Sequence, residues 1–236
     1  VADVSGESPQ QKSNFKISHM QISVFGLGYV GAVTSACLSN KDHTVTGVDI
    51  QEEKVAAINS GQSPIAEPGL AELLQSGHAV GKLSATTDVR EAINASVFSI
   101  VCVGTPSLES GHLNLSFVRE VCRQIADAIE AKGTSHTLVL RSTILPGSTR
   151  QLTEQLFSKL VSQNRIQVAY CPEFLREGTA LKDYHDPSLA VSGSFEGTPI
   201  PEVDQVMGEA EWSRWEAAEL TKYSCNYFHA LKVAFA

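Results

Sequence analysis

Residues 20–31, MQISVFGLGYVG, decide the fold because they join an apolar run to a glycine-rich turn and then to a helix of small residues. Glycines stand at positions 26, 28 and 31, which gives the spacing GxGxxG. In this motif Gly26 permits the tight turn, Gly28 allows a pyrophosphate to approach the backbone, and Gly31 lets the helix pack closely on the strand. Free N–H groups at the helix start then face the phosphates.

Asp49 ends the next apolar run, TVTGVD at 44–49, and lies 18 positions after Gly31. A carboxylate there can accept hydrogen bonds from the adenosine ribose and repels a 2′-phosphate, so the pattern predicts NAD rather than NADP. Lys54 weakens this prediction slightly, because a cation close to Asp49 can receive a phosphate. The alternative is a plain βαβ unit with a surface aspartate, which the motif, its flanks and its spacing together disfavour.

From Met20 onward, short apolar runs alternate with patterns that have the period of an α-helix. The run VFSIVCV at 97–103 is continuous, which is typical of a buried parallel strand. Because helical segments separate the runs, the pattern predicts an α/β fold with a Rossmann-like, doubly wound and mostly parallel sheet. We expect strands at 20–25, 44–49, 82–86, 97–103, 137–141, 167–171 and 189–191, and helices at 29–38, 54–58, 68–74, 88–93, 118–129, 146–160 and 212–236.

The composition excludes several classes of protein. With 18 basic and 26 acidic residues the net charge is −8, which argues against a nucleic-acid binder held by a general basic surface. No run approaches the length of a membrane span, so we expect none. The five cysteines are odd in number and form no CxxC motif, so we expect no disulfide framework and no metal site, and a reducing cytoplasm fits best.

The chain divides into three expected parts. Residues 1–19 are polar and have no apolar period, so we expect a disordered leader or an expression remnant. Residues 20–208 form the dinucleotide-binding domain. Residues 209–236 form the start of a long central helix, which we expect to be truncated because its pattern reaches Ala236 with no stop signal.

Hydroxyl residues follow two of the expected strands, at Val103-Gly104-Thr105-Pro106 and at Arg141-Ser142-Thr143. In an open α/β sheet, ligands gather beyond the carboxyl ends of the strands, so these hydroxyls suit a nicotinamide-ribose site. Taken singly, each segment is more often ordinary turn chemistry.

The last expected helix carries a polar stripe. Lys222, Asn226 and His229 are spaced by four and three residues and fall within about 60° of one another on a helix. A cation, an amide and an imidazole on one face can hold a polar or anionic ligand, although the spacing alone equally describes a solvated face. Glu173 and Glu177 follow the sixth strand near the same rim, where acids at a helix start are the alternative.

Six segments together give the sequence a family resemblance. The chain from Met20 to its end resembles the nucleotide-sugar 6-dehydrogenases, a family that uses NAD. The segments are FGLGYVG at 25–31, SPIAEPGL at 63–70, VGTPS at 103–107, RSTILPG at 141–147, PEFLREGTALKDY at 172–184 and KYSCNYFHALKVAFA at 222–236.

The resemblance implies a four-electron oxidation of a sugar C6 alcohol to a carboxylate with two NAD molecules used in turn. A cysteine thiolate captures the aldehyde as a thiohemiacetal, and the thioester that follows is hydrolysed by water. Within the family, VGTPS and His229 favour the branch that makes GDP-mannuronate from GDP-mannose for alginate biosynthesis. A UDP-glucose 6-dehydrogenase is the alternative in the same class.

The resemblance also assigns roles to single residues. Lys222 stabilises the developing C6 oxyanion, Asn226 orients it, and Glu177 positions the hydrolytic water. Leu175, Arg176, Glu177, Lys222, Asn226 and His229 match substrate positions. Gly26, Gly28, Tyr29, Val30, Gly31, Asp49, Lys54, Thr105 and Thr143 match positions that contact NAD.

One departure from the family pattern is large. The family's nucleophilic cysteine lies in a glycine-rich segment beyond the last helix, and none of the five cysteines here lies in such a segment. We therefore expect an NAD-binding portion that lacks the C-terminal sugar-nucleotide domain, binds NAD without turning over substrate, and forms a homodimer through the central helix. A non-catalytic NAD-binding or oligomerisation module is the different-class alternative, which the residues of the polar stripe disfavour.

Overall fold

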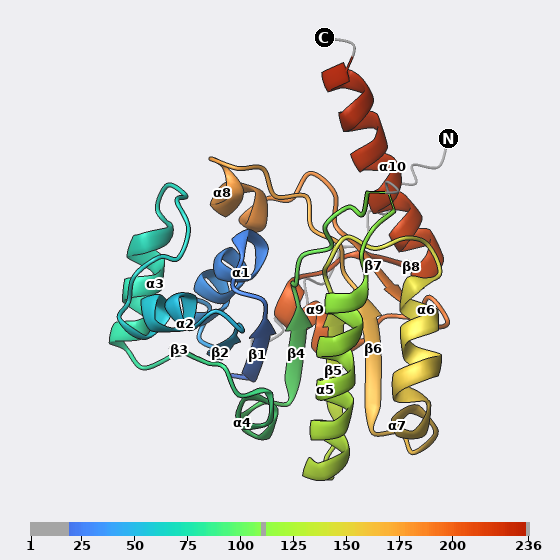
Figure 1. The fold of residues 1–236 in the computed structure, drawn as a ribbon, viewed down its shortest axis with the longest axis horizontal. Coiled ribbons are helices and arrows are strands. Elements are labelled where there is room, and N and C mark those ends of the chain that lie inside the picture. The colour runs from blue at the N-terminus through green and yellow to red at the C-terminus, as the bar shows by residue number, and fades with distance from the viewer. Residues whose placement is uncertain (1–18, 110–111, 235–236) are drawn as a thin grey trace, which may run out of the picture.

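The computed structural model describes residues 19–109 and 112–234, and from residue 226 onward it describes the backbone alone. Within these residues one sheet has eight strands in the order β3-β2-β1-β4-β5-β6-β7-β8 (Figure 1). The strands β1 to β6 are parallel, β7 is antiparallel to β6, and β8 is parallel to β7. The first six strands have the Rossmann order, which confirms the predicted α/β fold. The strands are β1 Gln21–Phe25, β2 Thr44–Val48, β3 Leu83–Thr86, β4 Phe98–Val101, β5 His136–Leu140, β6 Ile166–Tyr170, β7 Val191–Ser194 and β8 Glu211–Arg214.

Helices cover both faces of the sheet (Figure 1). One face packs against α1 Tyr29–Ser39, α2 Glu52–Asn59, α3 Leu70–Ala79, α8 Ala180–His185 and α9 Pro201–Met207. The other packs against α4 Val89–Ala95, α5 Ser116–Lys132, α6 Ser148–Leu152, a π-helical turn at Thr153–Phe157 and α7 Ser158–Ser162. The last helix, α10 Trp215–Ala234, begins directly after β8 and extends away from the sheet (Figure 1).

The glycine-rich turn fixes how α1 meets the sheet. Gly26 has φ +91°, a left-handed conformation that a side chain would strain. A Cβ on Gly31 would lie 1.7 Å from the Gly26 carbonyl oxygen, so only glycine allows the helix to pass this close. Behind this contact α1 is buried from Gly31 to Ser39. The small residues of its sequence therefore serve close packing against β1 and β2.

The carboxyl-terminal part differs from the expectation in two ways. The last helix begins at Trp215 rather than Trp212, because Glu211–Arg214 pair with β7 as an edge strand. Trp212 packs against the core, and its indole N–H donates to Asp204 Oδ1 over 2.8 Å. The helices α8 and α9, six and seven residues long, are absent from the expected elements because two turns or fewer carry little periodic signal. The expected leader at 1–19 lies outside the described residues except for His19.

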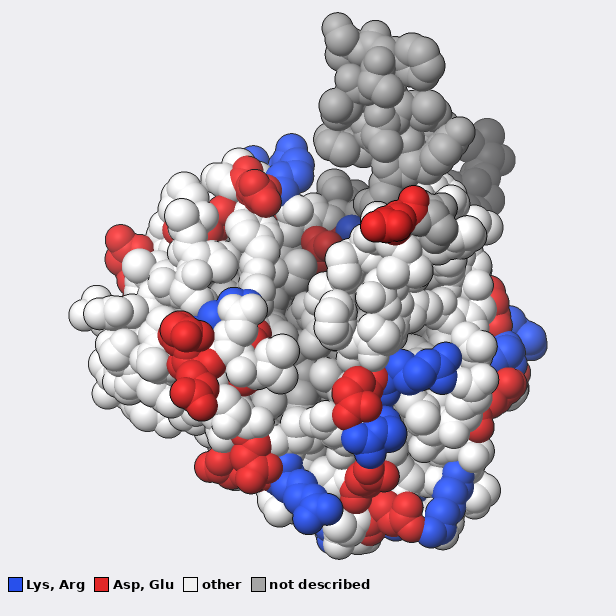
Figure 2. All heavy atoms as spheres, viewed as in Figure 1, with Lys and Arg blue, Asp and Glu red and all other residues white. Residues whose placement is uncertain are grey.

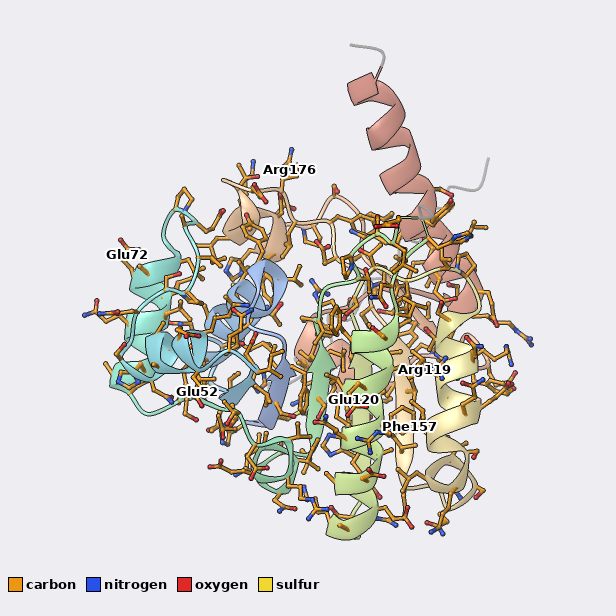
Figure 3. The ribbon with its side chains drawn as sticks, viewed as in Figure 1. Glu52, Glu72, Arg119, Glu120, Phe157 and Arg176 are labelled. Carbon is orange, nitrogen blue, oxygen red and sulfur yellow. The ribbon has the colours of Figure 1, made fainter. Side chains whose placement is uncertain are left out.

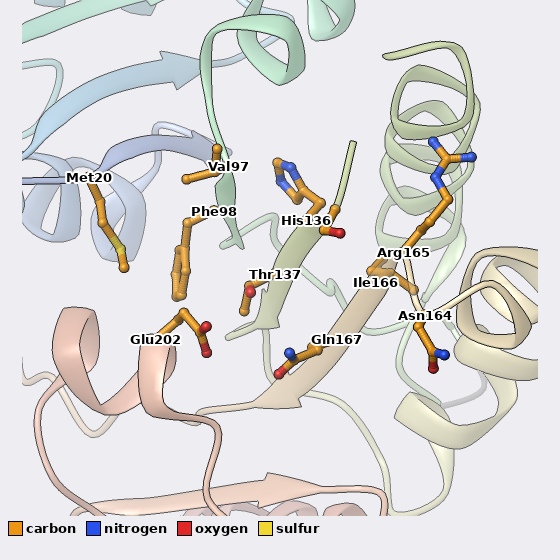
Figure 4. A pocket seen from close by; sticks show the side chains of 11 residues that line it. Met20, Val97, Phe98, His136, Thr137, Asn164, Arg165, Ile166, Gln167 and Glu202 are labelled. Carbon is orange, nitrogen blue, oxygen red and sulfur yellow. The ribbon is translucent and has the colours of Figure 1, made fainter. Parts of the chain in front are cut away.

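A cavity of about 280 Å³ lies at the amino ends of β4, β5 and β6 (Figure 4). Phe98, His136 and Glu202 are among its lining residues. His136 is buried, its Nε2 lies 2.7 Å from Ser99 Oγ, and burial lowers the pKa of His136 to about 3. The imidazole is therefore neutral at physiological pH. Because the glycine-rich turn follows the carboxyl end of β1, this cavity lies at the opposite edge of the sheet from the turn.

Acidic and basic side chains lie close to one another on the surface. Figure 2 shows acidic and basic groups interspersed on one face of the molecule rather than gathered into a basic patch. The described part of the chain contains no helix with the length and apolar character needed to cross a membrane. Within that part, no group of three or more potential metal ligands is assembled.

The contact at Gly31 predicts a large loss of stability for Gly31→Ala. The new methyl group overlaps the Gly26 carbonyl, so α1 must move away from the turn, at a cost of about 1–3 kcal/mol or more. Urea denaturation followed by circular dichroism measures the change.

Gly104→Ala is the matched control. A Cβ at this position meets nothing within 4 Å, so the free energy of unfolding should stay within about 0.5 kcal/mol of the wild type. Equal stability of the Gly31 variant and the wild type would contradict the assigned packing.

Candidate functional site

Asp49 ties the end of β2 to the glycine-rich turn. Its Oδ2 accepts a hydrogen bond from the Leu27 N–H at 2.7 Å, and its Oδ1 accepts from the Gln51 N–H at 3.0 Å. Lys54 Nζ lies 3.4 Å from Oδ2, so the nearly buried carboxylate also has a cationic partner. The sequence predicted Asp49 and Lys54 as residues of one site with the turn, and in the structure Asp49 contacts both the turn and Lys54.

Gly28 occupies the start of α1 in an ordinary backbone conformation, with φ −75° and ψ −162°. A Cβ built on Gly28 meets no atom within 4 Å, in contrast to the overlap at Gly31. Neither the backbone nor the packing therefore requires glycine at this position. The N-terminus of α1, where Tyr29 and Val30 begin the helix, has no side-chain cap. The uncapped N–H groups at the start of α1 are suited to an anion, and Gly28 leaves free space beside them.

The two strand-end segments with hydroxyl residues are joined to each other. Thr105 Oγ1 donates a hydrogen bond to the Thr143 carbonyl oxygen at 2.7 Å, and Ser142 Oγ donates to the Val103 carbonyl oxygen at 2.6 Å. Thr105 and Thr143 therefore lie side by side beyond β4 and β5. Because β1 lies next to β4, they share the carboxyl edge of the sheet with the glycine-rich turn.

Lys222 on α10 meets the segment that follows β6. Its Nζ donates to the Glu173 carbonyl oxygen and lies 3.1 Å from Glu173 Oε1. The ammonium group also lies 4.9 Å from the centre of the Phe174 ring. Lys222 is only 5% exposed, so this carboxylate supplies the partner that a buried cation needs. The sequence placed Glu173 at the rim without naming it as the partner of Lys222.

The other predicted substrate residues are arranged differently. Glu177 is exposed. Among the described side chains, Lys222 pairs with Glu173 and not with Glu177. Leu175 is half-buried, and its N–H donates to Glu173 Oε2 at 2.7 Å. The Arg176 guanidinium binds the buried Asp183 carboxylate at 2.6 Å and holds the pKa of Asp183 well below its usual range. Asn226 and His229 lie on α10, in the part of the helix for which the structure describes only the backbone.

Sequence reasoning missed Glu67, which is 8% exposed. Its Oε2 accepts hydrogen bonds from Tyr29 Oη at 2.6 Å and from the Gly178 N–H at 2.8 Å, and its Oε1 accepts from the Ala180 N–H at 2.8 Å. The signal in the sequence is the single acid in the otherwise uncharged segment PIAEPGL at 64–70.

Glu219 was also missed, and it is fully buried on α10. Its carboxylate accepts from the Gly147 N–H at 2.5 Å, from the Thr149 N–H at 2.7 Å and from Thr149 Oγ1 at 2.6 Å. Burial raises the pKa of Glu219, and these three donors oppose that effect. Glu219 therefore caps the start of α6 from a distant helix and fixes α10 against the sheet.

Comparison with known proteins places these features in a family. Residues 20–206 match the UDP-glucose/GDP-mannose dehydrogenase family, NAD binding domain. A GDP-mannose 6-dehydrogenase of Pseudomonas syringae pv. tomato is 46% identical over 232 residues, which cover 92% of this chain and 51% of that protein. A UDP-glucose 6-dehydrogenase of Haloferax volcanii is 33% identical over 230 residues, covering 92% of this chain and 53% of that protein.

Solved structures that resemble this chain are dehydrogenases of the same kind. A ternary complex of GDP-mannose dehydrogenase from Pseudomonas aeruginosa is 43% identical with a TM-score of 0.83, and the match covers 92% of this chain and 51% of that one. A UDP-glucose dehydrogenase from Pyrobaculum islandicum is 33% identical with a TM-score of 0.86, covering 98% and 53%. The chain spans about half the length of the curated relatives that it matches. From its glycine-rich turn to α9, it belongs to the UDP-glucose/GDP-mannose dehydrogenase family and contains the family's NAD-binding domain.

Proposed function

We propose that this chain holds NAD at the carboxyl edge of its sheet and supplies the coenzyme half of a GDP-mannose 6-dehydrogenase. The observation that carries the proposal is the contrast between two glycines of one motif. Gly31 is required by helix packing, whereas Gly28 is required by nothing in the protein itself. A ligand that approaches the backbone at Gly28 explains the glycine, and the uncapped start of α1 suits the pyrophosphate of that ligand.

The remaining cofactor residues follow from this placement. Asp49, held against the turn by the Leu27 N–H, faces the adenosine ribose, and Lys54 balances its charge. Gly26, Tyr29 and Val30 present their backbone to the phosphates. Thr105 and Thr143, joined beyond β4 and β5, lie where the nicotinamide ribose would bind. NAD, when bound, supplies the hydride acceptor.

Lys222, Glu173 and Glu177 carry the proposed chemistry on the substrate side. The Lys222 ammonium group, held beside the Glu173 carboxylate, can stabilise an oxyanion developing on the sugar C6 oxygen. Asn226 orients that oxygen, and the exposed Glu177 positions the water that hydrolyses the thioester. Leu175, Arg176 and His229 line the sugar pocket in this proposal.

GDP-mannose is the proposed substrate because identity is 46% to a GDP-mannose enzyme and 33% to a UDP-glucose enzyme. The product would be GDP-mannuronate, an alginate precursor, made in the cytoplasm.

A homodimer through α10 is proposed because Leu220 and Tyr223 on that helix are 53% and 44% exposed.

A protein extended to the length of its relatives should reduce NAD with GDP-mannose at least about tenfold faster than with UDP-glucose. The reverse preference would exclude this substrate.

The free space at Gly28 predicts that Gly28→Ala separates binding from folding. The free energy of unfolding should stay within about 0.5 kcal/mol of the wild type, since the methyl group meets no protein atom. The affinity for NAD should fall at least about tenfold, or ~1.4 kcal/mol, because the methyl group fills the space of the pyrophosphate. Isothermal titration calorimetry with NAD measures the loss. Unchanged NAD affinity would remove the main support for the proposal.

Asp49→Ala should weaken the preference for NAD over NADP. The variant loses the carboxylate that favours a ribose hydroxyl and leaves Lys54 free to receive a 2′-phosphate. We expect the ratio of NADP to NAD affinity to rise about tenfold or more.

Glu52→Ala is the matched control, because Glu52 is an exposed acid in the first turn of α2, where Figure 3 labels it. Its cofactor preference should equal that of the wild type. If the Asp49 variant also keeps the wild-type preference, Asp49 does not bind the ribose.

A further inference from the structure

Glu67 connects two parts of the candidate site that are far apart in sequence. It lies in the loop before α3 and accepts hydrogen bonds from α1 and from the segment that precedes α8. Its Oε2 meets both the phenol of Tyr29, the first residue of α1, and the Gly178 N–H. Its Oε1 meets the Ala180 N–H. The helices α1 and α8 also contact each other, so the carboxylate joins segments that already lie side by side (Figure 1).

Tyr29 is tied to Glu67 by its side chain while its backbone begins α1. Its phenol donates to Glu67 at 2.6 Å and lies 3.1 Å from the Arg176 carbonyl oxygen. Burial and the adjacent Glu67 carboxylate raise the pKa of Tyr29, so the phenol keeps its proton as a donor. A ligand bound at the start of α1 therefore touches a residue whose side chain is already linked to Glu67.

The segment 176–180 is held mainly by two carboxylates. Asp183 binds the N–H and the guanidinium of Arg176, at 3.0 and 2.6 Å, which closes the segment locally. Glu67 fastens it to the loop before α3 through the amides of Gly178 and Ala180, and the Tyr29 phenol joins its Arg176 carbonyl oxygen to α1. Gly178 has φ +83°, and this left-handed conformation turns its N–H to the carboxylate. The exposed Glu177 belongs to this segment and lies directly before Gly178.

We propose that Glu67 is a positioning residue that couples dinucleotide binding at the start of α1 to the ordering of residues 176–180, the segment that carries Glu177. The inference deepens the proposed function and rests on it. Binding of a dinucleotide fixes Tyr29, Tyr29 fixes Glu67, and Glu67 fixes the amides of Gly178 and Ala180. Because coupling free energies are reciprocal, an ordered segment also strengthens dinucleotide binding.

The chemistry of the contact requires a carboxylate. Three donors share the two oxygens of Glu67, so each oxygen must act purely as an acceptor. Glutamine at this position keeps the shape but offers one acceptor oxygen, and its NH2 group then faces a backbone N–H. A buried donor left without an acceptor is costly, so Glu67→Gln should release the segment without removing packing atoms.

Hydrogen exchange at Gly178 and Ala180 tests the coupling with NAD as the probe. In the wild type, saturating NAD should slow exchange at both amides at least about fivefold, the lower end of measured allosteric couplings. Glu67→Gln should speed exchange in the free protein, abolish the NAD effect and raise the dissociation constant for NAD at least about fivefold.

Two further variants separate coupling from simple support. Tyr29→Phe keeps the amide bonds to Glu67 but removes the phenol and its contact with the Arg176 carbonyl oxygen. Exchange at Gly178 and Ala180 in the free protein should therefore stay near the wild-type rate, while the NAD effect disappears. Glu72→Gln is the control, because Glu72 is an exposed acid on the outer side of α3 (Figure 3). It should leave exchange and NAD affinity unchanged. If Glu67→Gln does not fold, Tyr29→Phe alone tests the coupling between NAD binding and exchange at Gly178 and Ala180.

The outcomes distinguish this inference from the proposed function. If NAD binds the wild type without slowing exchange at Gly178 and Ala180, the coupling is wrong and NAD binding stands. If Tyr29→Phe keeps the full NAD effect, the link through the phenol is wrong. If the folded wild type does not bind NAD, the proposed function itself is wrong and the coupling falls with it.

Discussion

The close approach of Gly31 to the Gly26 carbonyl is the constraint on which the rest of the site depends. This contact lets α1 begin directly at the carboxyl end of β1, so the free N–H groups of the helix stand at the edge of the sheet. A parallel sheet then brings the ends of β2, β4 and β5 to the same edge, with Asp49, Thr105 and Thr143. The position of every candidate cofactor residue follows from that contact and from the strand order.

Buried and half-buried carboxylates organise the loops around this edge. Asp49, Glu67, Glu173 and Glu219 each accept at least one hydrogen bond from a backbone N–H of another segment or of their own loop. They hold those segments in place because carboxylate oxygens offer several acceptor sites to donors that would otherwise be unpaired. Part of the acidic character of the chain is thus structural. The cations Lys54 and Lys222 form ion pairs with such carboxylates, which hold the two ammonium groups near the proposed ligands.

The sequence predicted the elements whose signals are local. The continuous apolar run predicts the strand β4, and the long amphipathic pattern predicts the helix α5. The GxGxxG spacing places the turn between β1 and α1. The sequence predicts a helix over residues 212–214 of β8, because so short a segment fits the spacing of a helix as well as that of a strand. The roles of Glu67 and Glu219 could not be predicted, since their partners lie 38 or more positions away along the chain. Glu173 was placed at the correct rim, but its pairing with Lys222 depends on how α10 crosses the end of β6.

We propose the carboxyl edge of this sheet as the site for NAD. Isothermal titration calorimetry of the folded chain with NAD and with NADP tests this placement. We expect one NAD bound per chain and an affinity for NADP that is at least about tenfold weaker, because a carboxylate at Asp49 would repel a 2′-phosphate. A folded chain that binds neither dinucleotide, or that binds NADP as tightly as NAD, would contradict it.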